Sequence, residues 1–282
     1  ESEVFLPGVR IPDSIVIDTE TEPDVDIAVL AVPSHVMRTV LESHEFAART
    51  VRVNVAKGIE NDSLMLMDEV IRDVHGDIPT VTLSGPSHAE EVGRDLPTLI
   101  CAAGRDRDAC VEVQHAFAGP MFRVYTSSDV IGVELGGSLK NIIAIAAGVC
   151  DGFGFGDNAR AALMTRGLAE ISRLGTAMGA DPLTFMGLTG MGDLIVTCGS
   201  PHSRNRNVGL RIAQGMTTEE AVNASPMVAE GVRTTKSAWA LAQRHGVDMP
   251  ITHQVHRVLF EGADARQAVT ELMLRELKSE LS

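Results

Sequence analysis

The sequence is poor in residue types that mark several large classes of protein. Aromatic residues make up 4% of its 282 positions, and its four cysteines show no Cys-x-x-Cys spacing, which disfavours a zinc site. We interpret the cysteines as reduced and mostly buried. Positive charge is also scarce: 24 lysines and arginines face 38 acidic residues, and the net charge of −14 argues against a nucleic-acid or anionic-membrane surface. An anionic ligand therefore needs a local basic cluster.

Long hydrophobic runs and terminal signals are lacking too. The longest uninterrupted apolar runs are about half of what spans a bilayer. The first residues contain neither a basic nor a hydrophobic segment. We therefore expect no membrane span and a cytoplasmic location. With 44% hydrophobic and 22% charged residues, the composition is that of a folded globular protein, and the length suits two domains.

The first half of the chain alternates apolar strand-like runs with helical stretches. Strands are predicted at about 26–32, 50–55, 80–83, 98–102 and 122–125, and helices at about 35–44, 62–75, 88–93 and 106–117. This alternation predicts an α/β fold with a doubly wound, mostly parallel sheet.

After residue 128 the strand signal disappears. The segments with helical periodicity or start signals are 129–149, 158–178, 182–198, 204–214, 218–224, 230–245, 252–260 and 264–271. The sequence thus predicts an α/β domain over 1–128 and an all-α domain over 129–282.

The helix that opens the second domain carries an unusual lysine. Leu135 and Leu139 lie on an apolar stripe, whereas Gly136 and Gly137 belong to a face of small residues on which Lys140 is the one long side chain. Each internal glycine costs a helix roughly 1 kcal/mol relative to alanine. Two interpretations remain open: the glycines admit a neighbouring helix while the lysine reaches water, or the lysine faces a substrate cleft.

Further polar residues follow predicted strands. Lys57 comes directly after the second strand, at the carboxyl end where open α/β sheets place their ligands. The loop Ser84-Gly85-Pro86-Ser87-His88 follows the third strand, and Ser87 with Glu90 has the spacing of a capping box. His88 is expected to be structural. We expect this loop to face the same cleft as Lys57.

Two segments of the helical half stand out. Ser203, Arg204 and Asn205 precede or open a predicted helix, and a serine cap, a guanidinium and free amides at a helix N-terminus suit phosphate. A plain surface loop is the alternative. Asp193 lies among glycines in Gly187-Leu-Thr-Gly-Met-Gly-Asp193, where it would either pair with a lysine or accept a substrate hydroxyl.

A glycine loop that cradles phosphates is not found. Gly152-Phe-Gly-Phe-Gly156 is the nearest candidate, but it lacks the sixth-position glycine and follows a helix instead of a strand. We interpret it as a linker before the next helix or, alternatively, as a loop that lines a cleft.

Taken in order, these motifs resemble the bacterial NAD(P)-dependent glycerol-3-phosphate dehydrogenases. The similarity also takes in Phe5-Leu-Pro-Gly8, so it spans essentially the whole chain. The motifs that carry it are Val133-Glu-Leu-Gly-Gly-Ser-Leu-Lys140-Asn-Ile, Gly156-Asp-Asn-Ala-Arg-Ala-Ala, Gly187-Leu-Thr-Gly-Met-Gly-Asp193-Leu, Ser203-Arg-Asn205 and Val228-Ala-Glu230-Gly.

The resemblance implies reversible hydride transfer between NAD(P)H and dihydroxyacetone phosphate, giving sn-glycerol 3-phosphate for phospholipid synthesis. It makes Lys140 the proton donor and acceptor, and Lys57 a second catalytic residue that contacts both substrate and cofactor. The implied substrate-binding residues are Lys57, Gly85, Ser87, Lys140, Asp193, Ser203, Arg204 and Asn205, and the implied cofactor-binding residues are Phe5, Lys57, Ala89, Arg204, Val228 and Glu230. The cofactor is NADP or NAD, no metal is implied, and a homodimer is the common assembly.

One departure from the family is expected to matter. The family opens with a strand, a Gly-x-Gly-x-x-Gly turn, a helix and a second strand, roughly 35 to 40 residues that the sequence does not show before Phe5. The sheet is therefore predicted to be incomplete and NAD(P)H binding to be weak. The alternatives to an active enzyme are a non-catalytic glycerol-phosphate-binding remnant and an inactive fragment.

Overall fold

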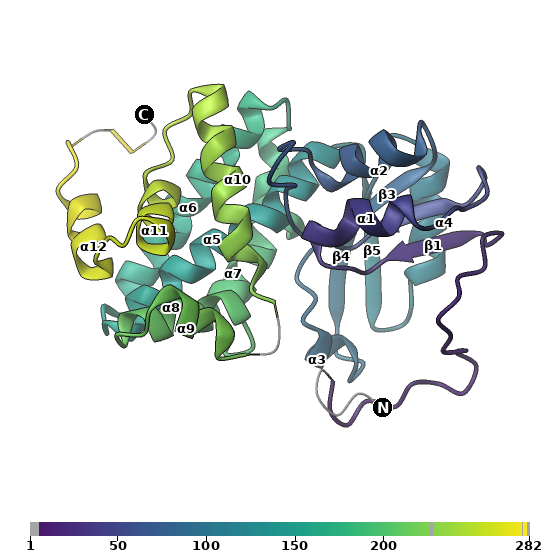
Figure 1. Ribbon diagram of the computed structural model, residues 1–282, viewed down its shortest axis with the longest axis horizontal. Coiled ribbons are helices and arrows are strands. Elements are labelled where there is room, and N and C mark those ends of the chain that lie inside the picture. The colour runs from purple at the N-terminus through teal and green to yellow at the C-terminus, as the bar shows by residue number, and fades with distance from the viewer. Residues whose placement is uncertain (1–5, 226–227, 278, 281–282) are drawn as a thin grey trace.

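The computed structural model describes residues 6–225, 228–277 and 279–280. A five-stranded sheet with its helices forms one half and helices from α5 onward form the other, as Figure 1 shows on its right and left. The strands are β1 (Ile27–Leu30), β2 (Val51–Asn54), β3 (Thr80–Ser84), β4 (Thr98–Ala103) and β5 (Phe122–Ser127). This confirms the α/β fold class and the mostly parallel sheet.

The strands are arranged in sequence order, β1-β2-β3-β4-β5. Neighbours pair in parallel except β3 and β4, which are antiparallel with Leu83 opposite Ala102. The continuous apolar run of β1 is typical of a strand buried on both faces, yet Val29 is 47% exposed because β1 is an edge of the described sheet.

The two faces of the sheet differ in chemistry because side chains alternate along each strand. Val53 and Val81 lie on a face that packs with α4, through Ala109 and Val113. The opposite face of the same two strands carries buried polar side chains, namely Arg52, Asn54, Thr80 and Thr82. The helices of this half are α1 (Met37–Glu42), α2 (Met67–His75), α3 (Ala89–Val92) and α4 (Arg107–Phe117), with a 3₁₀ turn η1 (Ser34–Val36).

Helix α2 begins five residues later than predicted. Leu64 has a φ of 64°, and Ile59 forms an isolated bridge with Leu66, so residues 59–66 make a tight reversal. The Glu69 carboxylate then accepts a hydrogen bond from the Leu66 amide at 2.8 Å, which satisfies a free donor at the new helix start.

The helical half is built around α5 (Val130–Gly152), whose core includes Leu135, Leu139 and Ile142, all at most 1% exposed. Its length and apolar composition would suffice to cross a membrane, but 89% of the apolar window is buried inside the protein, as expected of a core helix. The other helices are α6 (Gly156–Ala177), α7 (Asp193–Gly199), α8 (Arg204–Ala213), α9 (Thr218–Asn223), α10 (Glu230–His245), α11 (Pro250–Phe260) and α12 (Ala265–Met273).

Glycines allow α5 and α8 to touch at backbone distance. A Cβ atom added to Gly148 would lie 1.9 Å from the Arg206 carbonyl oxygen, and one added to Gly209 would lie 1.9 Å from the Ile145 oxygen. No side chain fits at either position, so the two helix axes are held close and the start of α8 is fixed relative to α5.

The single helix predicted over 182–198 is divided into three pieces. A 3₁₀ turn η2 (Pro182–Met186) and a π-helical turn η3 (Leu188–Gly192) precede α7. Gly190 lies so close to Phe185 that an added Cβ would be 2.1 Å from its carbonyl oxygen. π-helical turns are frequent at functional sites, and this one delivers Asp193 to the first position of α7.

Candidate active site

Lys140 is buried in the middle of α5 instead of reaching water. It is 5% exposed, and its Nζ donates to Asp193 Oδ1 at 2.5 Å and to Thr197 Oγ1 at 2.6 Å. Both partners lie on α7. The interpretation in which Lys140 reaches water is therefore wrong, because the lysine is held by a buried carboxylate and a buried hydroxyl.

Lys57 reaches the same carboxylate from the other half of the protein. It lies just after β2, and its Nζ donates to Asp193 Oδ2 at 2.7 Å and to the Gly85 carbonyl at 3.1 Å. Each oxygen of Asp193 thus receives one lysine, and Asp193 is only 1% exposed. The ion pair predicted for Asp193 is present, and it joins the α/β half to the helical half.

The protonation of this cluster follows from burial and from its two like charges. Burial and, next, the charge of Lys57 lower the pKa of Lys140 to about 8, against the pull of Asp193. Burial alone would raise the pKa of Asp193, but Lys57 and Lys140 outweigh it and the pKa is lowered. The cluster therefore contains an ionised carboxylate and a lysine that can lose its proton near neutral pH.

The two glycines before Lys140 allow close approach on this face of α5. A Cβ atom on Gly136 would lie 2.7 Å from the Thr189 carbonyl oxygen in η3, and one on Gly137 would lie 2.5 Å from Ser84 Oγ. The backbone of η3 and the end of β3 thus lie directly against the helix. The glycine face brings the three cluster residues within reach of one another.

The loop after β3 borders the cluster, as predicted, but its cap does not form. Gly85 has a φ of 138°, and an added Cβ would lie 3.0 Å from the Ile100 Cα, so both conformation and space require glycine. Ser87 Oγ donates to the Gly85 carbonyl at 3.1 Å instead of capping α3. Helix α3 starts after His88, and no described side chain caps it, so the predicted Ser87 capping box was wrong. Ser87 and Ala89 are both exposed.

The predicted anion segment forms the start of α8. Ser203 caps the helix by accepting from the Arg206 amide at 3.3 Å, and Asn205 Oδ1 accepts from the Gly231 amide at 3.0 Å. Both residues are buried, whereas Arg204 is exposed. A positive helix end with one solvent-facing guanidinium is suited to binding a phosphate at low desolvation cost.

The predicted cofactor residues of the helical half lie beside this segment. The Arg204 guanidinium donates from Nη1 to the Val228 carbonyl at 3.0 Å. Glu230 accepts from the Ser34 amide at 3.2 Å and therefore reaches across to the loop after β1. Burial raises the pKa of Glu230. Phe5 lies outside the described residues.

Comparison with known proteins identifies the family of this chain. Residues 129–270 match the family model described as NAD-dependent glycerol-3-phosphate dehydrogenase C-terminus, and residues 1–110 match the model of its N-terminus. The chain belongs to the NAD-dependent glycerol-3-phosphate dehydrogenase family. Because the N-terminal model matches from residue 1, the predicted absence of a glycine-rich opening is not confirmed.

Relatives of this dehydrogenase family cover nearly the whole chain. The glycerol-3-phosphate dehydrogenase [NAD(P)+] of Pelotomaculum thermopropionicum is 53% identical over 98% of this chain and 81% of its own length. The Bacillus subtilis enzyme of the same name is 50% identical over 98% of this chain and 82% of its own. A crystal structure of glycerol-3-phosphate dehydrogenase from Coxiella burnetii superposes with a TM-score of 0.90 at 40% identity, covering 96% of this chain and 84% of that one.

Sequence reasoning missed one partner in the lysine cluster, Thr197, and gave no sign of two unpartnered atoms beside it. Nothing in the pattern pointed to Thr197, although its distance of four residues from Asp193 puts both on one face of α7. The neighbouring loop holds two buried polar atoms with no partner among the described residues, Ser84 Oγ and His88 Nε2. Burial and then the charge of Lys140 lower the pKa of His88.

These orphaned atoms are the observation that tests whether a nicotinamide cofactor fits. Buried polar groups rarely lack partners, and Ser84 and His88 flank the loop that borders Lys57. A hydroxyl and a ring nitrogen suit the carboxamide and ribose groups of such a cofactor. The residues present therefore fit the group, and no cluster of His, Cys, Asp or Glu in the described ranges could hold a metal ion.

Proposed function

We propose that this chain catalyses reversible hydride transfer between NAD(P)H and dihydroxyacetone phosphate, with sn-glycerol 3-phosphate as the product of reduction. The observation that carries the proposal is the buried Lys140, held by Asp193 opposite Lys57. When bound, the nicotinamide supplies the hydride or accepts it. The protein's own residues then have to manage a proton and a negative charge.

Lys140 is the proposed proton donor and acceptor at the C2 oxygen. In reduction that oxygen becomes an alkoxide, and the Lys140 ammonium protonates it. In oxidation the neutral amine takes the hydroxyl proton, which requires a pKa near the working pH, and that of Lys140 is about 8. Lys57 is the proposed second catalytic residue, since its charge stabilises the developing alkoxide beside the buried Lys140.

The substrate phosphate is proposed to bind at the start of α8, beside Ser203, Arg204 and Asn205. Free backbone amides and the Arg204 fork recognise a dianion there. Gly85, Ser87 and Asp193 are proposed to contact the glycerol part, because the first two follow β3 beside the lysines.

The nicotinamide cofactor is proposed to lie beside Lys57, Ala89, Arg204, Val228 and Glu230. Phe5 keeps its predicted cofactor role as a proposal. The cofactor is NADP or NAD, since none of these residues is identified with a ribose 2′ position. The weak cofactor binding predicted from the sequence stays a prediction, to be measured by calorimetry with NADH and NADPH.

Further parts of the proposal follow from family membership. We place the reaction in glycerophospholipid synthesis in the cytoplasm, with a homodimer as the expected assembly. Residues 1–128 and 129–282 are proposed to be the dinucleotide-binding and substrate domains.

The test is steady-state oxidation of NADH and NADPH by the purified chain with dihydroxyacetone phosphate. Turnover that saturates with the substrate is expected. A chain that shows no turnover but is thermally stabilised by glycerol 3-phosphate would be the non-catalytic remnant. One that shows neither turnover nor stabilisation would be the inactive fragment.

A further inference from the structure

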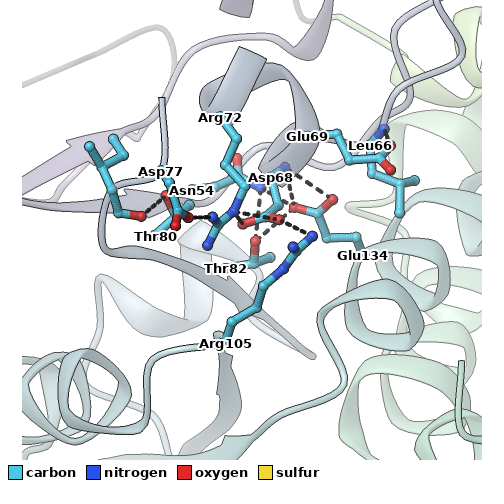
Figure 2. A network of polar contacts seen from close by, with 11 residues as sticks. Asn54, Leu66, Asp68, Glu69, Arg72, Asp77, Thr80, Thr82, Arg105 and Glu134 are labelled. Carbon is cyan, nitrogen blue, oxygen red and sulfur yellow. Dashed lines mark hydrogen bonds and ion pairs between the residues drawn. The ribbon is translucent and has the colours of Figure 1, made fainter. Parts of the chain in front are cut away.

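A second buried carboxylate of α5, Glu134, lies six residues before Lys140 and points to the sheet. Glu134 is 5% exposed. Its Oε1 accepts from Thr82 Oγ1 at 2.7 Å, from Asn54 Nδ2 at 3.0 Å and from the Asp68 amide at 3.1 Å. Figure 2 shows these donors converging on Glu134 from β2, β3 and the start of α2. One oxygen atom thus joins α5 to three elements of the α/β half.

One of these three contacts continues to the catalytic loop. Asn54 is the last residue of β2 and is fully buried. While its Nδ2 donates to Glu134, its Oδ1 accepts from the Ala56 amide at 2.9 Å. Ala56 directly precedes Lys57. The amide side chain of Asn54 therefore connects Glu134 to the backbone that presents Lys57. Thr82 Oγ1 also accepts from Asn54 Nδ2 at 3.4 Å, but no hydrogen bond among the described residues joins Thr82 or the Asp68 amide to the Ala56 backbone.

We propose that Glu134 is a positioning residue that, through Asn54, holds the Lys57 loop at a fixed place relative to Lys140. This inference rests on the function proposed above. Both ends of the connection belong to α5, since Glu134 and Lys140 are six residues apart on it, about 9 Å along the helix axis. The helix thereby carries one lysine of the pair and fixes the other.

The placement of Lys57 matters because its charge is one of the causes that set the protonation of Lys140. If the Lys57 loop moved outward, the positive charge of Lys57 would lie further from Lys140. Asp193 would then lose Lys57 and pair with Lys140 alone. Both changes favour the protonated lysine. The charged and titratable groups that act on Lys140 or feel its charge are Lys57, Asp193, Cys198, His88 and Glu230.

The chemistry of Glu134 suits a rigid anchor. Burial raises its pKa to about 8, with the charge of Asp68 acting in the same direction and its hydrogen bonds opposing them. Asp68 is itself paired with Arg72 and Arg105, both at 3.3 Å. The donors from Thr82 and Asn54 both meet Oε1, so a proton on Oε2 leaves their acceptor in place, whereas the Asp68 amide also reaches Oε2 at 3.3 Å. A glutamine should preserve the same acceptor.

The test compares four variants of the full chain: Glu134→Ala, Glu134→Gln, Asn54→Ala and Thr82→Val. Thr82→Val is the matched control, because it removes the donor to Glu134 and a long 3.4 Å contact with Asn54, but leaves the bonds that join Asn54 to Glu134 and to Ala56. We expect Asn54→Ala and Glu134→Ala to lower kcat by about tenfold or more. Glu134→Gln and Thr82→Val should stay within about threefold of wild type.

The deciding readout is the pH profile of glycerol 3-phosphate oxidation. The apparent pKa of the rising limb should move up by about one unit in Asn54→Ala, but not in Thr82→Val. The inference is overturned if wild type is active and these two variants share one kcat and one profile, or if Glu134→Gln loses as much activity as Glu134→Ala. An inactive wild type would instead overturn the proposed function.

Discussion

Glu134 lies on α5, and Asp193 contacts the same helix from α7. Both carboxylates are buried, yet their pKa values shift in opposite directions. Glu134 meets dipoles, two side-chain groups and one backbone amide, and its pKa rises to about 8. Asp193 meets two ammonium groups, and its pKa falls. Desolvation opposes the charge of both groups, so the difference comes from their partners. Dipoles hold a carboxyl group in place, whereas cations also keep it ionised.

This difference separates two tasks along α5. The sheet end of the helix carries an anchor that gains nothing from being charged. The cluster around Lys140 needs a permanent negative charge, because two lysine ammonium groups lie within hydrogen-bond distance of Asp193. The following experiments remove a charged or a neutral partner of these groups, or measure the effect of each carboxylate on stability.

The largest effect is expected from removing the charge of Lys140, the α5 lysine that pairs with Asp193. Lys140→Met keeps the aliphatic stem but removes the proposed acid and base, so kcat should fall by about 10² to 10⁴. Steady-state rates in both directions measure the loss. Lys236→Met, on the exposed side of α10, is the control and should keep full activity. Comparable rates for the two variants would refute the role of Lys140.

Neutralising Asp193 should be the next largest change. Asp193→Asn leaves Lys57 and Lys140 facing each other without a counter-charge, and breaking such a buried pair costs about 3 to 5 kcal/mol. Urea unfolding monitored by circular dichroism gives the free energy of unfolding. The exposed Asp157→Asn variant, which loses a surface ion pair with Arg160, should be nearly unchanged. Equal stability of the two variants would contradict the conclusion that the lysine cluster needs the charge of Asp193.

The opposite protonation of the two carboxylates predicts opposite effects of pH on stability. Glu134 has an unfolded pKa of about 4.3 and a folded pKa of about 8. The folded protein therefore binds the extra proton, and its stability declines as pH rises from about 4.3 to 8. Glu134→Gln should make this decline shallower, by up to about 1.4 kcal/mol per pH unit.

Other groups set the background of that measurement. Burial raises the pKa of Glu170 to about 7, so part of the decline should persist in Glu134→Gln. Asp193 contributes with the opposite sign, since its stabilisation is present above the unfolded pKa and is lost in acid. A slope identical to that of wild type would mean that Glu134 is ionised in the folded protein.

The smallest effect is expected at Thr197, where a neutral partner joins the charged cluster. Its hydroxyl accepts from Lys140 at 2.6 Å and donates to Asp193 at 3.3 Å. Thr197→Val keeps the shape and should cost about 1 kcal/mol in stability with only a few-fold change in kcat. Thermal unfolding and steady-state rates check this. An effect as large as that of Asp193→Asn would show that dipoles also govern this end of α5.

Much of the fold was readable because it rests on local patterns. The five strands and most helices coincide with the predicted segments, since periodicity and turn residues act within a few positions. The failures have tertiary causes. Helix 182–198 is divided where Gly190 packs on Phe185, and the start of α2 is set by a bridge between Ile59 and Leu66.

The site was predictable to a different degree. Lys57, Lys140 and Asp193 were found by motif, and their mutual contacts agree with the expected pairing. The roles of these residues remain predictions. Glu134 and Asn54 carried no signal of their own, because a buried carboxylate and a buried amide on separate elements acquire meaning only when packing brings them within 3.0 Å.

The backbone contact between α5 and α8 also bears on which molecules the site admits. Lys140 lies on one of these helices and Ser203 to Asn205 begin the other, while Gly148 and Gly209 leave no side chain between them. The separation between Lys140, the proposed proton donor, and the helix start proposed to bind phosphate is therefore fixed by main-chain atoms. This separation would set the length of the substrate that the proposed site admits. A longer separation would require a change in the backbone and not in a side chain.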